Sequence, residues 1–499
     1  MRPCRLLLVP LAALLCAGAP PPKTYWVRQG GDNTKDGSNN TDKAWATLAR
    51  ACDLTKNPHP AAGDTVRVMP GNYAGFICDP LNGSSGKMIT IVSDTPLGAV
   101  INTSVVDGQG AQHCATFLNS SYVHFEGFTF SGCTGLWAIA FGHSTYMEAV
   151  GHSVDGAPTG AGAVVAGTIN ATLSDSTFVH NGIAVGHDWT NAKSSNVTLS
   201  ANSVSHAPAA ALTVGDASDV VAYNNLFFRN AGIGIAVVSG GALVAYNNTV
   251  FQGTGDGWCV DAASGATSLL AENNILITGG GAGVIADQSV AGVVTSNDNV
   301  VTDAAMTGYQ ATWSSHGTNP IGLATWQLVT SNDASSLSSD YDHEFLDTTN
   351  DDYRLKVGAK AIGHGVATIG TQSAPTIDIE GAARDPLNVD IGAYVYVPYD
   401  AGPVPPDAGA PIVLDSGVAE PDTGVPAAVD SGVAEADTGV PVAVDSGVPV
   451  AVDSGLPVVV DSGSPVVVDS GAPVEVDSGA PAKVDAGAPV EIDSGVPVE

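Results

Sequence analysis

The chain has 499 residues and a formal net charge of −33, from 50 acidic and 17 basic side chains. This excess of negative charge excludes charge-driven binding to nucleic acid or to an anionic membrane, and a polyanionic ligand would need bound cations as a bridge. The 59 glycines and the low content of charged residues, 13%, favour short β-strands joined by tight turns over helices.

Residues 1–19 have the composition of a secretory signal peptide. A basic start with Arg2 and Arg5 is followed by an apolar run that is too short to cross a bilayer, and then by small residues. The sequence therefore predicts export, to a secreted or bacterial cell-surface location. No later segment is long and apolar enough to be a membrane span.

Five cysteines follow this segment, and their pairing has two interpretations. In an oxidising compartment, Cys52 with Cys78 and Cys114 with Cys133 are plausible disulfides, which leaves Cys259 single. Buried free thiols are the alternative, and the sequence does not decide between them.

Residues 398–499 repeat a unit of the form Asp-Ser-Gly-Val-Pro-Val-Ala-Val. The aspartates at 445, 453 and 461 are eight residues apart, and each unit carries a proline and a glycine. Regular like charge and frequent breakers prevent both a packed core and a long strand. We expect a disordered, extended acidic tail.

A different period marks the region before the tail. Similar segments at 220–228, 243–251 and 269–277 each contain an Asn-Asn pair. With the second Asn as the marker, the same slot recurs at steps of 22 to 27 residues. The series is Gly127, Ser153, Ser176, Ser203, Asn225, Asn248, Asn274 and Asn299.

Each step of this series is the length of one coil of a β-solenoid. Alternating apolar residues supply an inward row, and stacking at about 4.8 Å lets neighbouring coils complete one core. The asparagines would form a ladder of amides that bond to each other and to turn backbone. A β-sandwich with Asn-rich turns is the alternative, but its strands need not keep a constant register.

Segments at both ends of the repeated region are distinctive. The start has Thr-Tyr-Trp-Val-Arg at 24–28 and a run at 62–73 that ends in Pro-Gly-Asn-Tyr, and the end has Tyr-Arg-Leu at 353–355 and Asp-Ile-Gly-Ala-Tyr at 390–394. Together they resemble the entry and closing segments of pectate-lyase-like, secreted bacterial β-helix proteins. The resemblance implies an all-β fold, a right-handed single-stranded parallel β-helix.

This resemblance also implies an order of parts along the chain. We expect an N-terminal cap and first turn over residues 20–75, the parallel β-helix over 76–310 and a closing segment over 311–397. Gly363-His364-Gly365 and Asp351-Asp352 look like hydrolase motifs, but they fall in the closing segment. We therefore interpret both as coincidental.

Aligning the ends of the Gly-rich apolar strands brings polar residues into one column. In pectate-lyase-like proteins the outward strand face and its turns form the substrate groove, and carboxylates one coil apart can share Ca²⁺ that bridges to a uronate. Asp188, Asp216 and Asp261 are therefore the predicted calcium ligands. Local turn hydrogen bonds are the alternative explanation. The column reads His143, His187, Asp188, Asp216, Ser239, Asp261 and Asp287.

Side chains beside the column suggest ligand contacts and a base. Trp189 and Trp258 offer flat rings for sugar stacking, and His143 lies with them, although a tryptophan in an apolar strand can equally be core packing. A uronate lyase needs a base for the proton next to the carboxylate. The candidate catalytic residues are His187, Lys193 and Arg229.

Two functions follow from these observations. The first is a monomeric protein that binds a polysaccharide and processes it as a uronate lyase or epimerase. The second is a non-catalytic surface adhesin or matrix protein. No catalytic motif separates them.

Overall fold

The structure is a computed structural model that describes residues 21–398, except 107–111, 135–136, 157–160, 254–255, 281, 303–307 and 312–316. The predicted signal peptide, and the predicted repeat tail from residue 399 onward, lie outside the described residues. The described residues belong to one compact unit.

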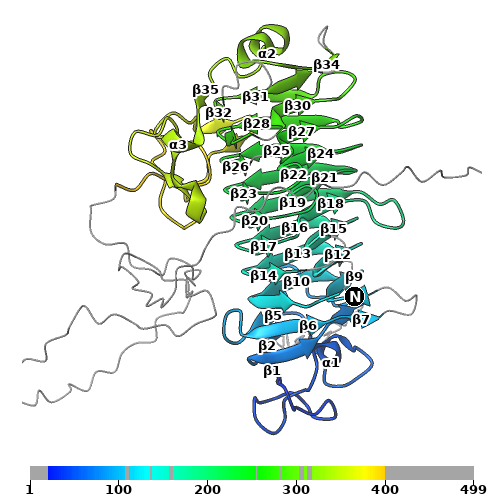
Figure 1. Cartoon of the computed structure of the whole chain (residues 1–499). Helices are drawn as coiled ribbons and strands as arrows, with labels where there is room; N and C mark the ends of the chain where they lie inside the picture. The colour runs from blue at the N-terminus through cyan, green and yellow to red at the C-terminus, as the bar shows by residue number, and fades with distance from the viewer. Residues whose placement is uncertain are drawn as a thin grey trace, which may run out of the picture. The chain divides into compact units, whose positions relative to one another are not determined.

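The chain winds into successive coils, and a typical coil contributes one strand to each of three 11-stranded sheets (Figure 1). The pairing is parallel throughout, except for the antiparallel last pair of sheet C, β33 with β34. Sheet A contains β1 (Thr24–Val27), β2 (Thr65–Val68), β5 (Ile89–Ser93), β10 (Ser121–Glu126), β13 (Thr145–Val150), β16 (Ile169–Ser174), β19 (Ser194–Ser200), β22 (Ala217–Tyr223), β25 (Ala242–Tyr246), β28 (Ser268–Glu272) and β31 (Val294–Asn297). Sheet B contains β3 (Gly71–Ala74), β6 (Ala99–Thr103), β11 (Phe128–Ser131), β14 (Ser153–Asp155), β17 (Thr177–Val179), β20 (Ser203–Ser205), β23 (Leu226–Phe228), β26 (Thr249–Gln252), β29 (Ile275–Thr278), β32 (Val300–Thr302) and β35 (Leu337–Ser339). Sheet C contains β4 (Phe76–Cys78), β9 (Ala115–Leu118), β12 (Ile139–Gly142), β15 (Ala163–Ala166), β18 (Ile183–Gly186), β21 (Leu212–Val214), β24 (Ile235–Val237), β27 (Trp258–Ala262), β30 (Gly283–Asp287), β33 (Tyr309–Ala311) and β34 (Gly317–Ile321).

Short helices and hairpins lie outside the three sheets, along the coil and at its ends. The helices are α1 (Leu48–Cys52), α2 (Leu323–Thr330), α3 (Tyr341–Glu344) and the 3-10 turn η1 (Thr348–Asn350). The hairpins pair β7 (Val105–Val106) with β8 (Gln112–His113), β36 (Phe345–Asp347) with β37 (Asp352–Leu355), and β38 (Thr368–Ile369) with β39 (Gln372–Ser373).

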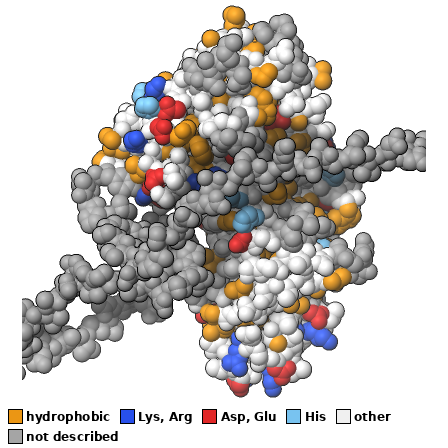
Figure 2. Space-filling view, in the orientation of Figure 1, with side chains coloured by type: hydrophobic (Ala, Val, Ile, Leu, Met, Phe, Trp, Pro, Cys, Tyr) orange, Lys and Arg blue, Asp and Glu red, His pale blue; other side chains and the backbone are white. Residues whose placement is uncertain are grey.

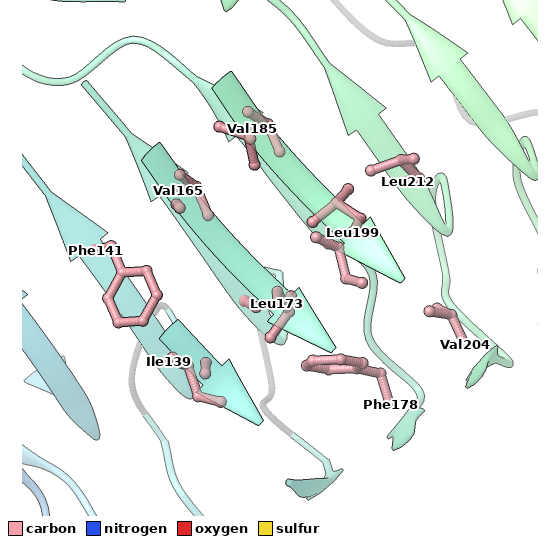
Figure 3. Packing of buried hydrophobic residues seen from close by; sticks show 14 of the residues in the cluster. Ile139, Phe141, Val165, Leu173, Phe178, Val185, Leu199, Val204 and Leu212 are labelled. Atoms are coloured by element: carbon pink, nitrogen blue, oxygen red, sulfur yellow. The ribbon is translucent and has the colours of Figure 1, made fainter. Parts of the chain in front are cut away.

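The core is a set of stacked apolar columns inside the coil. In sheet C, Phe141, Val165 and Val185 are register partners on successive strands, and Leu173 with Leu199 do the same in sheet A (Figure 3). Each of these side chains is buried. Burial of one such side chain stabilises the fold by about 1.5 to 3 kcal/mol. A single coil cannot bury these side chains alone, so each coil depends on its neighbours for this stabilisation.

The predicted asparagine ladder lies at the turn from sheet A to sheet B. Asn248 Nδ2 donates to Asn274 Oδ1 over 3.0 Å, and Asn225 Nδ2 donates to Asn248 Oδ1 over 2.9 Å. At two positions of the ladder, the sequence alignment chose the residue that follows the true ladder residue. The ladder uses Asn202 and His152 where the alignment placed Ser203 and Ser153, because those serines already begin β20 and β14.

His152 takes the place of an amide in this ladder. Its Nδ1 lies 3.2 Å from the backbone N of Phe128, and its Nε2 lies 3.0 Å from the carbonyl of Phe125. Burial lowers the pKa of this imidazole to about 3. The ring is therefore neutral, so that one nitrogen accepts and the other donates.

The closing segment covers the outer face of sheet B at its C-terminal half, beside β23 and β26 (Figure 1). Leu226, Phe251 and Ile275 project outward and pack against Phe345 and Tyr353. The first Asn of each Asn-Asn pair anchors this contact. Each has a positive φ and donates to a closing-segment carbonyl: Asn224 to Ile377, Asn247 to Asp390 and Asn273 to Val366.

Both ends of the coil are closed. At the N-terminal end, Trp45 is buried beside α1, whose first turn is capped by the Thr47 hydroxyl. At the other end Trp326 of α2 is buried and stacks on Tyr309, with ring centroids 5.3 Å apart. The parallel strands begin with β1, within residues 20–75, where the cap and the first turn were expected.

The two plausible disulfides are both present. Cys52 at the end of α1 is bonded to Cys78 of β4, and Cys114 is bonded to Cys133. Cys259 is a buried free thiol. The covalent links therefore lie in the N-terminal coils.

His124 lies between two carboxylates on the outer face of sheet A. Its Nδ1 lies 2.7 Å from Glu148 and its Nε2 lies 2.9 Å from Glu126, so both nitrogens must be protonated to donate. Burial opposes the charged ring, but the hydrogen bonds to Glu126 and Glu148 outweigh it and raise the pKa of His124.

This arrangement predicts a pH-dependent contribution to stability. The contribution of His124 is fully present below the unfolded-state pKa, about 6.5, and is lost as the pH rises through the higher folded-state pKa. Urea unfolding should show wild type more stable than His124→Gln by on the order of 1 kcal/mol at acidic pH, with a smaller difference at alkaline pH. His343→Gln, at an exposed ion pair with Asp340, should change little at any pH. A difference between wild type and His124→Gln that grows with pH would contradict the assignment.

Candidate functional site

The turn from sheet C to sheet A brings part of the predicted column together. Gly142, Ala166 and Gly186 are register partners, and Val185 pairs with Val214. The residues that leave these strands therefore stack at one corner of successive coils, in the order His143, Gly167, His187, Asp216 and Ser239. We call His143, His187, Asp188, Trp189, Lys193 and Asp216 the corner cluster.

Asp188 organises the loop that carries most of this cluster. Its Oδ1 accepts from the backbone N of Thr190 over 2.7 Å and from Ala192 N over 3.0 Å, and the hydroxyl of Thr190 donates to it as well. Its Oδ2 lies 2.7 Å from His143 Nδ1. Although the carboxyl is buried, which opposes its charge, these hydrogen bonds lower the pKa of Asp188 to about 2.

Gly167 makes the contact between Asp188 and His143 possible. His143 lies two coils away from Asp188, and Gly167 occupies the corner of the coil between them. A Cβ atom at Gly167 would lie 2.4 Å from Asp188 Oδ2, and the φ of Gly167 is +57°. A side chain here would therefore displace the carboxylate from His143.

Asp216 receives two basic side chains from the neighbouring coil. Lys193 Nζ lies 3.0 Å from Oδ1, and His187 Nδ1 lies 3.0 Å from Oδ2. The hydrogen bond from Lys193, followed by its charge and by His187, holds the pKa of Asp216 below its ordinary value, against a smaller opposing effect of desolvation. A backbone bridge between His187 and Lys193 closes the loop that both residues flank.

Trp189 extends from this loop into solvent, with 65% of its surface exposed. The edge of its indole covers Gly142, where an added Cβ would lie 3.1 Å from the ring. Its ring centroid is 6.4 Å from that of His143. The loop is fixed through Asp188, so the exposed ring has a defined position.

Asp261 lies outside this cluster. It pairs in register with Ala236, three positions before the corner, because β27 continues through Ala262 and the apolar run does not end where the alignment assumed. Asp287 is displaced in the same way, since it pairs with Ala262. Both oxygens of Asp261 lie 3.0 Å from Gln288 Nε2, and burial raises the pKa of this carboxyl to about 6.

The three predicted calcium ligands do not form a joint site. Asp188, Asp216 and Asp261 each use both carboxylate oxygens on protein donors of their own. Within the described ranges no group of three or more His, Cys, Asp or Glu side chains is placed to hold a metal ion. The residues therefore do not fit a calcium ion shared along the column, and no chemistry is assigned to one.

Arg229 and Trp258 lie at the opposite end of the sheet C strands, near the turn from sheet B. Arg229 follows β23, and its guanidinium pairs with Asp351 over 2.8 Å and donates to the carbonyl of Thr348. Trp258 begins β27 and lies over Gly283, where an added Cβ would be 2.3 Å from the ring. Neither residue reaches the corner cluster.

A row of exposed and half-exposed residues beside the cluster was missed by sequence reasoning. Ser121, Thr145 and Ile169 are register partners at the start of sheet A, and the residue after each has a positive φ. The row consists of Tyr122, Tyr146, Asn170, Asn196 and Asp219, with φ between 54° and 59°. We call it the sheet A row. The recurrence of Ser-Tyr and Thr-Tyr 24 residues apart was the available signal.

The matching family model is "Right handed beta helix region", which covers residues 117–300. Among solved structures, the chain is similar to pectate lyase Pel9A, with 16% identity, a TM-score of 0.42 and coverage of 75% of this chain and 96% of that one. It is also similar to an alginate lyase from Paenibacillus sp. str. FPU-7, with 18% identity, a TM-score of 0.37 and coverage of 50% and 97%. A third is PfbA, a surface adhesin of Streptococcus pneumoniae, with 13% identity, a TM-score of 0.36 and coverage of 48% and 70%. A search of curated sequences finds no match.

The topology and the family model define the class. The protein is a right-handed parallel β-helix, which confirms the fold that the resemblance of its end segments implied. None of the similar structures assigns an activity to this chain. In the part of the chain that the structure describes, no helix is long and apolar enough to cross a membrane.

Proposed function

We propose that the protein is a secreted or cell-surface β-helix that binds a polysaccharide at the corner cluster. The observation that carries this proposal is the exposed ring of Trp189, which is held in a fixed loop beside His143. The exposed indole offers a flat apolar face, and flat rings stack on sugar faces. The half-exposed imidazoles of His143 and His187 and the partly exposed carboxylate of Asp216 supply hydrogen bonds to hydroxyls.

Turnover is a second candidate, favoured by the pair of His187 and Asp216. A carboxylate that accepts from Nδ1 leaves Nε2 of the neutral ring as a base. On a uronate, this base would take the proton next to the carboxylate, the electron pair would form the new double bond, and the glycosidic oxygen would leave with a proton from solvent. This is the lyase interpretation of the column.

One experiment tests the proposal and separates the two candidates. We expect the purified full chain to be retained on a glycan array, and Trp189→Ala to weaken that binding about tenfold through loss of ring contact. Leu387→Ala removes another highly exposed apolar side chain, far from the cluster in the closing segment, and should leave binding unchanged. Unsaturated products that absorb in the ultraviolet, and that disappear in His187→Gln, would establish lyase turnover. Equal binding by wild type and Trp189→Ala would refute the proposed site.

A further inference from the structure

We infer that the polysaccharide is uncharged and lies along the helix axis on the sheet A row, crossing successive coils. This inference rests on the proposed function and names the ligand class and its direction.

The charges of the central coils are unsuited to a polyanion. Between residues 112 and 302 the sequence has twelve acidic residues and two basic ones, Lys193 and Arg229. Both basic side chains are paired, Lys193 with Asp216 and Arg229 with Asp351. In Figure 2 lysine and arginine side chains gather at the N-terminal end and over the closing segment. A uronate polymer would therefore meet net negative charge.

Four members of the row stand three residues after a residue that ends the turn from sheet C to sheet A, and in the longest turn this residue is Lys193, at the far end of the loop that begins at His187. Tyr146 follows His143, Asn170 follows Gly167, Asn196 follows Lys193, and Asp219 follows Asp216. The row and the corner cluster are consequently two edges of one surface. Because neighbouring strands are about 4.8 Å apart, the five residues of the row extend over about 19 Å along the axis.

The row offers hydrogen-bonding groups of the kind that sugar hydroxyls pair with. Tyr122 and Tyr146 stack with ring centroids 4.4 Å apart, and Asn196 Nδ2 donates to Asn170 Oδ1. Beside these groups Ile169 is 44% exposed and adds an apolar contact. Phenol, amide and carboxylate groups around an apolar side chain match a ring that has hydroxyls at its rim and C–H bonds on its face.

The positive φ of the row explains how the side chains come to face solvent. A residue in the left-handed region interrupts the alternation of the strand, so that it projects outward before the inward residue that follows, such as Val123 or Met147. Non-glycine residues pay a conformational cost in this region.

The test measures affinity against ligand length with the full chain. The probes are cello-, manno- and xylo-oligosaccharides from disaccharide to octasaccharide, with oligogalacturonates and oligomannuronates as acidic counterparts. We expect a neutral series to bind, with affinity that rises with length and levels off near five rings and that depends little on salt. Tyr146→Gly and Asn196→Gly should weaken long neutral oligosaccharides about fivefold to tenfold and disaccharides little. Glycine preserves the backbone conformation at both positions.

Asp175→Gly is the matched control. Asp175 is also exposed with a positive φ, at the turn from sheet A to sheet B, and its loss should leave every affinity unchanged. Tighter binding of the uronates, weakened by salt, would overturn the inference and leave the proposed function intact. Affinity that is independent of length, or unaffected by the two row variants, would also overturn it. Failure of every probe to bind would overturn both.

Discussion

Asn248→Ala should cost the protein about 3 to 5 kcal/mol of unfolding free energy. The Asn248 amide donates to Asn274 Oδ1 and to the carbonyl of Ala222, and its own oxygen accepts from the backbone N and Nδ2 of Asn225. Alanine would remove the acceptor of the buried backbone N–H of Asn225 and the side-chain donor to the carbonyl of Ala222. Each orphaned group costs about 1 to 3 kcal/mol.

Urea unfolding followed by circular dichroism measures this loss. Asn40→Ala is the control, because Asn40 is exposed in the N-terminal region, and it should change stability by less than about 0.5 kcal/mol. The ladder links one coil to the next, so hydrogen exchange should accelerate in the strands on both sides of Asn248. A loss below about 1 kcal/mol would mean that water or a rearranged turn replaces the amide.

The coil itself was predictable from sequence because the residues that build its core and its turns recur at a nearly constant spacing. Apolar residues that recur every two dozen positions must stack, and the Asn-Asn pairs fixed the register over Asn225, Asn248 and Asn274. The register slipped by one at Asn202 and His152, where serine follows the true ladder residue. Serine and histidine both satisfy the hydrogen bonds of the slot, so composition alone could not choose between adjacent polar residues.

The candidate site was predictable only where successive strands of sheet C keep the same register up to the corner. His143, His187 and Asp216 stack because the three strands before them end in register. Asp261 was misplaced because β27 runs on past it. The contact of His143 with Asp188 spans two coils, because the missing side chain of Gly167 leaves room for the Asp188 carboxylate. The sequence shows the glycine but does not show which side chain fills the space beside it.

The closing segment could not be placed from sequence, because hydrogen bonds that anchor it to the coil join residues 93 to 160 positions apart. Arg229 was read as a candidate base, but Asp351 of that segment holds its guanidinium. The first Asn of each pair also has its partner in the closing segment, since Asn224 and Asn273 donate to the carbonyls of Ile377 and Val366. The repeat pattern of the sequence does not indicate such long-range contacts.

Arg384 is the residue on which this long-range contact depends most. Its buried guanidinium donates to the carbonyls of Asp390 and Gly392 and to Asn224 Oδ1. Burial lowers the pKa of Arg384 to about 10, yet it stays charged at neutral pH. Hydrogen bonds to a charged donor are each worth about 1.5 to 3 kcal/mol.

We therefore expect Arg384→Ala to release the closing segment while the coil stays folded. The loss should be about 3 to 5 kcal/mol, confined to this contact, and it would expose the apolar outer face around Phe251. Limited proteolysis should cut within residues 345–396 at least tenfold faster, and hydrogen exchange should rise in β26 and β29 but not in sheet C. Arg67→Ala is the control, because Arg67 forms a half-exposed pair with Asp94, worth about 0 to 1 kcal/mol. Unchanged proteolysis in Arg384→Ala would show that apolar packing alone holds the segment, whereas general unfolding would show that the coil depends on its cover.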